Sequence, residues 1–320
     1  MDVVYGIDNY QADGVGSCVT VGTFDGLHIG HRCIMQTLLG EARDRGLRSV
    51  VLTFDPHPRQ ILAPGQRVDF VLTQQEKIEA FSRVGVDVLI IHPFSLQFAS
   101  LCAKDFLQLI MRNKLNMKCL VKGFNNHFGS DRLSDMDVIR MHGSNMGFDV
   151  CEVAAERDGS AMASSSLVRQ LVREGRMAEA SKILGYVFYI TGSVVHGRHI
   201  GRQIGFPTAN ISVSRDSGKI LPQPGVYVAS VDIDGHSLPA MMNIGSNPTV
   251  NADDSRQFVE VHVLDYSGNL YNSSLRVYIH KKIREEQKFP SLNALKAQLQ
   301  QDLEAVRDYF PITTSSNSSM

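Results

Sequence analysis

The chain has 320 residues, of which 43% are hydrophobic and 20% charged, and its formal net charge at pH 7 is −1. This length and composition predict a globular protein of two domains. The charges form neither a basic stripe nor an acidic tail, which gives no case for binding nucleic acid or a membrane surface and favours small-molecule substrates.

The N-terminus has no basic segment followed by an apolar run, and no stretch reaches the length that spans a bilayer. Five cysteines form no CxxC pair and are interpreted as reduced core residues. We therefore expect a cytoplasmic protein that is a monomer or weak homo-oligomer. The small, polar residues 311–320 are expected to form a disordered tail.

The first motif in the chain is TVGTFDGLHIGH, residues 20–31. Gly22 and Gly26 permit a sharp reversal between a buried strand and a helix. His28 and His31 fall three residues apart on the first turn of that helix, where unpaired N–H groups favour phosphate. The motif therefore predicts a nucleotide site. Two surface histidines on a polar turn remain an alternative, whereas zinc is disfavoured because no further ligand stands at suitable spacing.

Four further apolar runs, residues 49–54, 86–92, 118–123 and 148–153, alternate with helical patterns. Thr73 is predicted to cap one helix, with Glu76 at capping-box spacing, and residues 101–111 show another apolar helical face. The alternation predicts an α/β fold with a doubly wound parallel sheet. Ligands of such sheets bind at the carboxyl ends of the strands.

The loops at those strand ends carry unusual residues. One is DPHPR, residues 55–59, and another is GFNNHFG, residues 123–129. A third segment, SSSLVR at residues 164–169, brings hydroxyl groups and an arginine to a helix start. Each alone is typical of ordinary turn or cap chemistry. Their convergence on one edge of the sheet favours a binding site.

The motifs FDGLHIGH, TFDPHPRQIL, GFNNHFG and SSSLVR, in this order, resemble the nucleotidyltransferase half of the bacterial bifunctional riboflavin kinase/FAD synthetases. The resemblance implies that His28 and His31 hold the ATP phosphates and that Arg169 assists catalysis. It also implies ATP contacts from Gly22, Phe24, Asp25, Asn125, Ser165 and Ser166, and flavin contacts from Phe54, Pro56 and His57. Ser134 and Ala163 depart from the family pattern and leave the expected reaction class unchanged.

From Phe188 onward the hydrophobic period changes to two, which predicts a domain boundary near residues 185–187. The strands that follow predict a small antiparallel β-barrel, with hairpin turns at Asp234-Gly235 and Gly268-Asn269. A C-terminal helix is expected from Ser291, with an apolar stripe. The predicted domains are residues 1–186 and 187–310.

The segment GRHIGRQIGFPTAN, residues 197–210, lies between the first two barrel strands. Its glycines, Gly201 among them, leave amides accessible to phosphate, and Thr208 and Asn210 offer oxygen ligands to magnesium. A glycine-rich barrel loop is the alternative. Glu260 stands among valines, and most such glutamates face solvent. No GxxxxGK[ST] motif is present, which excludes a P-loop kinase.

This segment, together with GVYV, MNIGSNPTV and VEVHVLD, resembles the riboflavin kinase half of the same family. The resemblance implies that Thr208 and Asn210 hold Mg-ATP, that Gly201 belongs to the loop over the phosphates and that Glu260 is the general base. The expected function is phosphorylation of riboflavin to FMN with ATP, then adenylyl transfer to FMN, giving FAD and pyrophosphate. Alternatives are a nucleotidyltransferase for another phosphate ester and a non-enzymatic flavin or nucleotide sensor.

Overall fold

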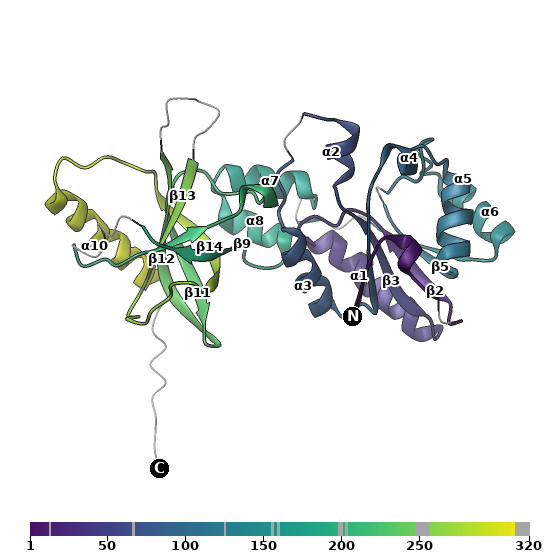
Figure 1. Ribbon diagram of the computed structural model, residues 1–320, viewed down its shortest axis with the longest axis horizontal. Coiled ribbons are helices and arrows are strands. Elements are labelled where there is room, and N and C mark those ends of the chain that lie inside the picture. The colour runs from purple at the N-terminus through teal and green to yellow at the C-terminus, as the bar shows by residue number, and fades with distance from the viewer. Residues whose placement is uncertain are drawn as a thin grey trace, which may run out of the picture. The chain divides into compact units, whose positions relative to one another are not determined.

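The computed structural model describes residues 1–12, 14–65, 68–124, 126–154, 157–158, 161–197, 201, 204–247 and 256–310. The chain forms two compact units, Met1–Ser165 and Ser166–Met320 (Figure 1). The division lies earlier in the chain than the change of periodicity near residue 186. The reason is that the two helices between residues 165 and 184 belong largely to the same compact unit as the barrel.

The first unit is built on a six-stranded parallel sheet in the order β1-β4-β3-β2-β5-β6. Its strands are β1 (Asp2–Tyr5), β2 (Ser17–Val21), β3 (Arg48–Phe54), β4 (Val88–His92), β5 (Met117–Gly123) and β6 (Asp149–Val153). The predicted doubly wound sheet is confirmed. The edge strand β1 was not anticipated, since four residues at the chain start give little periodic signal.

The helices of this unit follow the predicted alternation. They are η1 (Ile7–Asn9), α1 (Ile29–Asp44), α2 (Pro58–Leu62), α3 (Gln74–Val84), α4 (Leu96–Ala99), α5 (Ala103–Asp105), η2 (Phe106–Lys114) and α6 (Met136–Met146). A short hairpin, β7 (Arg157–Asp158) and β8 (Ala161–Met162), precedes the end of the unit. The capping box of α3 is confirmed, because Thr73 Oγ1 accepts from Glu76 N (3.2 Å) and Thr73 N donates to Glu76 Oε2 (2.9 Å).

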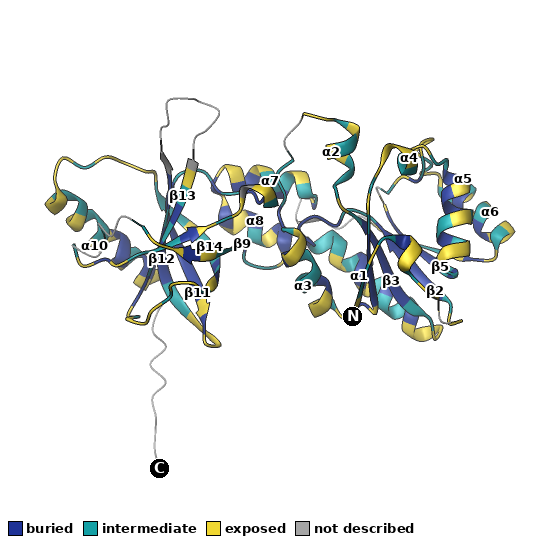
Figure 2. Ribbon diagram, viewed as in Figure 1, coloured by how far each residue is buried: buried dark blue, intermediate teal, exposed yellow. Residues whose placement is uncertain are grey.

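Both faces of the parallel sheet are covered, so its four central strands, β2 to β5, are buried along nearly their whole length, while the edge strands β1 and β6 are partly exposed (Figure 2). Val19, Leu52 and Ile90 pack on the face that meets η2. The predicted helix over residues 101–111 appears there as α5 followed by η2, in which the hydrogen bonds widen to the π pattern. The other face is packed by α1, which buries Ile34, Met35 and Leu38.

The second unit is a closed antiparallel barrel in the order β10-β13-β12-β11-β14-β9, as predicted. Its elements are α7 (Ser165–Arg173), which begins one residue ahead of the unit, α8 (Met177–Leu184), β9 (Tyr189–Val195), β10 (Ala209–Ser212), η3 (Arg215–Ser217), β11 (Gly225–Ile233), β12 (His236–Asn247), β13 (Arg256–Val263), β14 (Ser274–Arg284) and α10 (Leu292–Tyr309). The turn at Asp234-Gly235 is a tight hairpin with both residues at positive φ (49° and 80°). Gly268-Asn269 lies instead within a longer connection between β13 and β14.

The C-terminal helix α10 packs on the outside of the barrel. Leu303 and Val306 are buried against Val226 and Met241, so the predicted apolar stripe covers the barrel itself. The helix starts at the predicted place, and Ser291 is its N-cap residue, because its Oγ accepts from Ala294 N (3.2 Å). The helix α10 therefore forms one wall of the larger cavity described below.

Candidate active sites

The loop between β2 and α1 bends sharply at the carboxyl end of the sheet. Gly26 has φ of 85°, and two larger residues, Phe24 and Leu27, also adopt positive φ (46° and 39°). Non-glycine residues in this region carry strain and cluster at functional sites. Phe24 and Leu27 are both buried, so packing of their side chains holds the bend in place.

His28 and His31 meet face to face at the start of α1. Their ring centroids lie 3.6 Å apart with an interplanar angle of 20°. His28 is the N-cap residue, and its Nδ1 accepts from the backbone N–H of His31 (3.4 Å). A neutral ring that accepts at Nδ1 carries its proton on Nε2, which leaves Nε2 as a donor to a ligand. The predicted pairing of the two histidines on one helix face is therefore present.

Both histidines are held neutral by their surroundings. Burial lowers the pKa of His28 to about 4, and the carboxylate of Asp25 only partly opposes that shift. Burial, His28 and the charge of Lys77 hold the pKa of His31 well below its usual range. The Nδ1 atom of His31 is buried and has no hydrogen-bond partner among the described residues. Unsatisfied buried polar atoms are rare in native structures, which makes the histidine pair a candidate functional site.

A cavity of about 40 Å³ lies against the two histidines. It is lined by His28, Gly30, His31, Ile34, Gly123, Phe124, Val153, Ala154, Met162 and Ala163. A Cβ atom on Gly30 would lie 3.4 Å from the His28 ring, and one on Gly123 would lie 2.6 Å from Ile34 Cδ1. A side chain at position 123 would therefore displace the end of the Ile34 side chain beside this cavity.

Other predicted ATP contacts in this loop have structural partners. The carboxylate of Asp25 is buried and accepts from Val71 N (2.9 Å) and Leu72 N (3.1 Å). Phe24 is packed edge-on to His31, with ring centroids 5.3 Å apart, and fills the space under the histidine. Gly22 leaves room for the Phe24 ring, because a Cβ there would lie 3.0 Å from it. These residues shape the site, and their contacts to ATP stay predictions.

The SSSLVR segment reaches the loop through Ser165, whose Oγ donates to Asp25 O (2.8 Å). Ser166 and Arg169 belong to the second unit, where Arg169 Nη2 donates to Ser166 Oγ (3.3 Å). Their roles at the histidines stay predictions. Asn125 lies outside the described residues.

The predicted flavin contacts follow β3. Phe54 packs against Phe94 and Phe98, with ring centroids 5.3 and 5.6 Å away. His57 caps α2, since its Nδ1 accepts from Arg59 N (3.1 Å), and Pro56 precedes it. An aromatic cluster of this kind suits a flat ring system. Phe94 and Phe98 had no signal in the sequence beyond their hydrophobicity.

In the barrel, three polar residues stand side by side on neighbouring strands. Glu260 on β13 pairs directly with Asn210 on β10 and with Asn243 on β12. Paired residues of antiparallel strands share one face of a sheet. Glu260 therefore has an amide side chain on each side, while Val259 and Val261 point to the opposite, buried face.

These residues line a cavity of about 710 Å³, which also borders α10. Its polar wall includes Thr208, Asn210, Asn243, Glu260 and His262, and its apolar wall includes Ile204, Phe206, Val226, Met241, Leu295 and Leu299. A second cavity of about 640 Å³ lies beside Val261, Val263, Tyr266 and Tyr271. Thr208 lines both cavities, so a group bound at Thr208 would be within reach of ligands on either side.

The described part of the glycine-rich loop is closely packed. A Cβ on Gly197 would lie 2.0 Å from Asn210 Nδ2, and one on Gly201 would lie 2.3 Å from Phe206 O. His262, a residue that sequence reasoning did not single out, has its Nδ1 2.8 Å from Pro207 O. Residues 198–200 and 202–203 lie outside the described part of the chain.

Two further residues near the histidines could not be found from the sequence. Lys77 on α3 donates to Thr23 O (2.9 Å) beside the histidines, and burial lowers its pKa. Asn126 donates to Val21 O (2.8 Å) and so ties the GFNNHFG loop to β2. Both contacts join segments far apart in the sequence, and no local pattern marks them.

Comparison with known proteins matches the two units to two family models. The FAD synthetase model matches residues 11–167 and the riboflavin kinase model matches residues 184–310. No described helix has both the length and the apolar character needed to cross a membrane.

Among relatives, the bifunctional riboflavin kinase/FMN adenylyltransferase of Escherichia coli K12 is 37% identical over 98% of this chain and 99% of its own. The enzyme of the same name from Pseudomonas fluorescens is 38% identical over 96% of this chain and 97% of its own. A crystal structure described as a macrolide-efflux protein from Streptococcus pneumoniae has a TM-score of 0.87 at 32% identity, covering 96% of this chain and 99% of that one. The chain belongs to the bifunctional riboflavin kinase/FMN adenylyltransferase family.

Proposed function

We propose that this chain phosphorylates riboflavin to FMN in the barrel and converts FMN to FAD at the histidine pair of the first unit. The observation that carries the proposal is that each unit holds its own set of chemical groups. Glu260 stands between two amides at a large cavity, and His28 stacks on His31 beside a helix start. Both family models support the same pair of reactions.

For the kinase step, riboflavin occupies the larger cavity, whose apolar wall between α10 and the barrel suits the isoalloxazine ring. ATP occupies the second cavity, where Tyr266 and Tyr271 offer surfaces for the base. Thr208 lines both cavities and so lies between the two substrates. A ribityl hydroxyl is a poor nucleophile, so Glu260 takes its proton as the oxygen bonds to the γ-phosphorus and the bond to the ADP oxygen breaks.

The amides beside Glu260 orient its carboxylate. Asn210 and Asn243 sit at the paired positions on either side, where their amides can reach the carboxylate. Thr208 and Asn210 also supply oxygen atoms of the kind that magnesium prefers, and Gly197 leaves the space that the Asn210 side chain needs. Bound magnesium would neutralise charge on the ATP phosphates.

The adenylyl transfer needs no base, because the phosphate of FMN is already ionised. Its oxygen attacks the α-phosphorus of ATP, and pyrophosphate leaves. His28 and His31 donate N–H groups to the phosphates, and the N-terminus of α1 adds its dipole. The aromatic cluster at Phe54 supports FMN binding on the same unit.

The test is to incubate the purified chain with riboflavin, ATP and Mg²⁺ and to resolve the flavins by chromatography. We expect FMN first and FAD after it, with pyrophosphate equal to FAD. Transfer of AMP to a supplied phosphate ester other than FMN, with no FAD formed from FMN, would favour a nucleotidyltransferase for another phosphate ester. Flavin binding without any product would indicate a sensor. A cytoplasmic location and a monomeric or weakly oligomeric state are proposed on composition alone, and size-exclusion chromatography tests the latter.

A further inference from the structure

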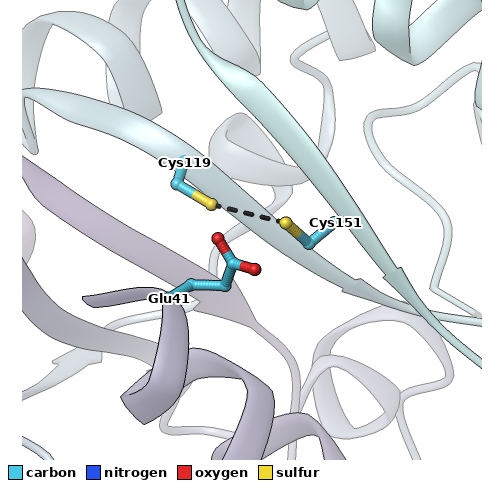
Figure 3. Close-up of side chains that lie close together, drawn as sticks. All are labelled: Glu41, Cys119 and Cys151. Carbon is cyan, nitrogen blue, oxygen red and sulfur yellow. Dashed lines mark hydrogen bonds between the residues drawn. The ribbon is translucent and has the colours of Figure 1, made fainter. Parts of the chain in front are cut away.

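A cluster of two thiols and a carboxylate lies in the first unit, away from the histidine pair. Glu41 comes from α1, Cys119 from β5 and Cys151 from β6 (Figure 3). One donor atom from each residue lies within 4.8 Å of the other two. Glu41 stands 13 positions after His28 along α1, which corresponds to roughly 20 Å along a helix. The cluster is therefore separate from the adenylyl-transfer site.

The spacing of the sulfur atoms matches a tetrahedral metal site. Cys119 Sγ and Cys151 Sγ are 3.8 Å apart and form a hydrogen bond between the two thiols, a spacing that a shared metal ion would also give. Two thiolates bound to one Zn²⁺ at about 2.3 Å in tetrahedral geometry are separated by about 3.8 Å. A disulfide requires about 2.0 Å, so the thiols are much nearer to the metal-bound spacing than to the covalent one.

The carboxylate of Glu41 is oriented by a second group. Arg45 Nε donates to Glu41 Oε2 (2.8 Å), and Arg45 also pairs with Asp149 on β6. Figure 3 shows one oxygen of the Glu41 carboxylate pointing towards the two sulfur atoms. Partners that hold a ligand in this way are typical of metal sites.

A divalent cation offsets most of the negative charge of the cluster. Two thiolates, Glu41 and the Asp149 carboxylate that shares Arg45 carry four negative charges, and the cation and Arg45 supply three positive charges. A further thiol stands next to the cluster, because Cys18 on β2 pairs with Cys119 in the sheet and forms a side-chain hydrogen bond with it.

We propose that Glu41, Cys119 and Cys151 bind a thiophilic divalent cation, with Zn²⁺ as the best match to two sulfur ligands and one oxygen ligand. Binding releases the two thiol protons to solvent and leaves one coordination position to Cys18 or water. The ion links α1 to β5 and β6 and takes no part in either flavin reaction. Its effect is to stabilise the first unit.

The experiment uses full-length protein without a histidine tag, reduced and freed of metal with a chelator. Cd²⁺ is then titrated, and the thiolate-to-metal charge-transfer absorption is recorded, since histidine sites elsewhere do not produce this band. We expect saturation at one equivalent. In parallel, Zn²⁺ should raise the melting temperature of the wild type, because a ligand that binds the native state stabilises it.

Two variants and two controls make the test specific. Cys151→Ser and Glu41→Gln should each weaken Cd²⁺ binding at least tenfold. Cys33→Ser and Cys102→Ser remove half-buried thiols outside the cluster and should bind as the wild type does. Retained FAD formation from supplied FMN, a reaction of the first unit, and an unchanged circular dichroism spectrum verify that the variants are folded.

The proposal is overturned if the wild type shows no thiolate band, or if both cluster variants bind Cd²⁺ as tightly as the controls. Mild oxidation followed by mass spectrometry gives an independent check. A loss of two hydrogens that maps to Cys119 and Cys151, in protein that does not bind Cd²⁺ when reduced, would identify a disulfide pair and reject the metal site.

Discussion

Asn210 and Glu260 face each other across the pairing of β10 with β13, and both line the larger barrel cavity. They are 50 positions apart in the chain, by subtraction of their residue numbers. The closed barrel brings the proposed metal ligand and the proposed base together on one face. Substitution of Glu260 therefore tests its proposed role as the base in FMN formation.

Glu260→Gln removes the proposed base and keeps the size and shape of the side chain. Loss of a general base costs about 10²–10⁴-fold in rate, so kcat for FMN formation should fall by that factor while the KM for ATP changes little. FAD formation from supplied FMN should be unchanged. Glu304→Gln, an exposed substitution on α10, is the matched control. If Glu260→Gln forms FMN at the wild-type rate, Glu260 is not the general base.

His28→Ala removes one of the two stacked rings beside the helix start. Because it deletes a donor to the ATP phosphates, FAD formation should fall by about 10²–10³-fold. FMN formation in the barrel should persist. The readout is separate assay of the two steps, with riboflavin or FMN as the starting flavin, and His142→Ala on α6 serves as the control. If His28→Ala makes FAD at the wild-type rate, the phosphate role is wrong.

The stability of the protein should depend on pH through His28. Its pKa is lowered from 6.5 to about 4 in the folded chain, so between these values the unfolded state binds more protons. The free energy of unfolding therefore has its full value, as far as His28 is concerned, above about pH 6.5. It falls progressively as the pH is lowered towards 4, by a total of about 3 kcal/mol.

The measurement is denaturant unfolding at pH 7 and pH 5 for the wild type and for His28→Asn, which retains a capping oxygen. The wild type should lose more stability than the variant on going to pH 5. Equal losses in both proteins would mean that His28 titrates as it does in the unfolded chain.

The ion pair between Arg284 and Asp302 should anchor α10 to the barrel. Arg284 Nη2 lies 2.8 Å and Nε 3.0 Å from the Asp302 carboxylate oxygens, and Asp302 is 1% exposed. Removing one partner of a buried pair costs about 3–5 kcal/mol, so Asp302→Asn should lower the melting temperature of the barrel and weaken riboflavin binding.

Arg307 and Asp265 supply the matched control, because this pair is exposed and longer (3.5 Å). Asp265→Asn should change stability by no more than about 1 kcal/mol. Similar effects of Asp302→Asn and Asp265→Asn on the unfolding transition would contradict the anchoring role.

The barrel unit should function on its own. From the change in periodicity alone, a fragment that starts near Lys182 would be expected to suffice. In the structure, however, Gln223 Nε2 donates to Glu174 O (2.8 Å), and α8 buries Met177 and Ile183. A fragment covering residues 166–310 should therefore fold, melt cooperatively and make FMN but never FAD.

The shorter fragment, residues 182–310, should be less stable, because it lacks most of α8. Thermal melts and kinase assays of both fragments check this order. An inactive or insoluble 166–310 fragment would show that the barrel depends on the first unit.

Patterns within a few residues of the chain determined much of this structure. The alternation of apolar runs with helical periods specified the parallel sheet, and the period of two after Phe188 specified the barrel. The spacing of His28 and His31 placed both rings on one face of α1, and the spacing of Thr73 and Glu76 gave the capping box of α3. Each depends on backbone geometry that repeats over one helical turn or two strand positions, which sequence spacing records directly.

Tertiary structure alone decided the contacts between distant segments. It directed the Asp25 carboxylate to the N–H groups of Val71 and Leu72, brought Lys77 beside the histidines, and set Asn243 beside Glu260. It also gathered Glu41, Cys119 and Cys151, which stand on three separate elements. Which segments meet depends on strand order and helix packing over the whole domain, and no local spacing in a single sequence encodes that order.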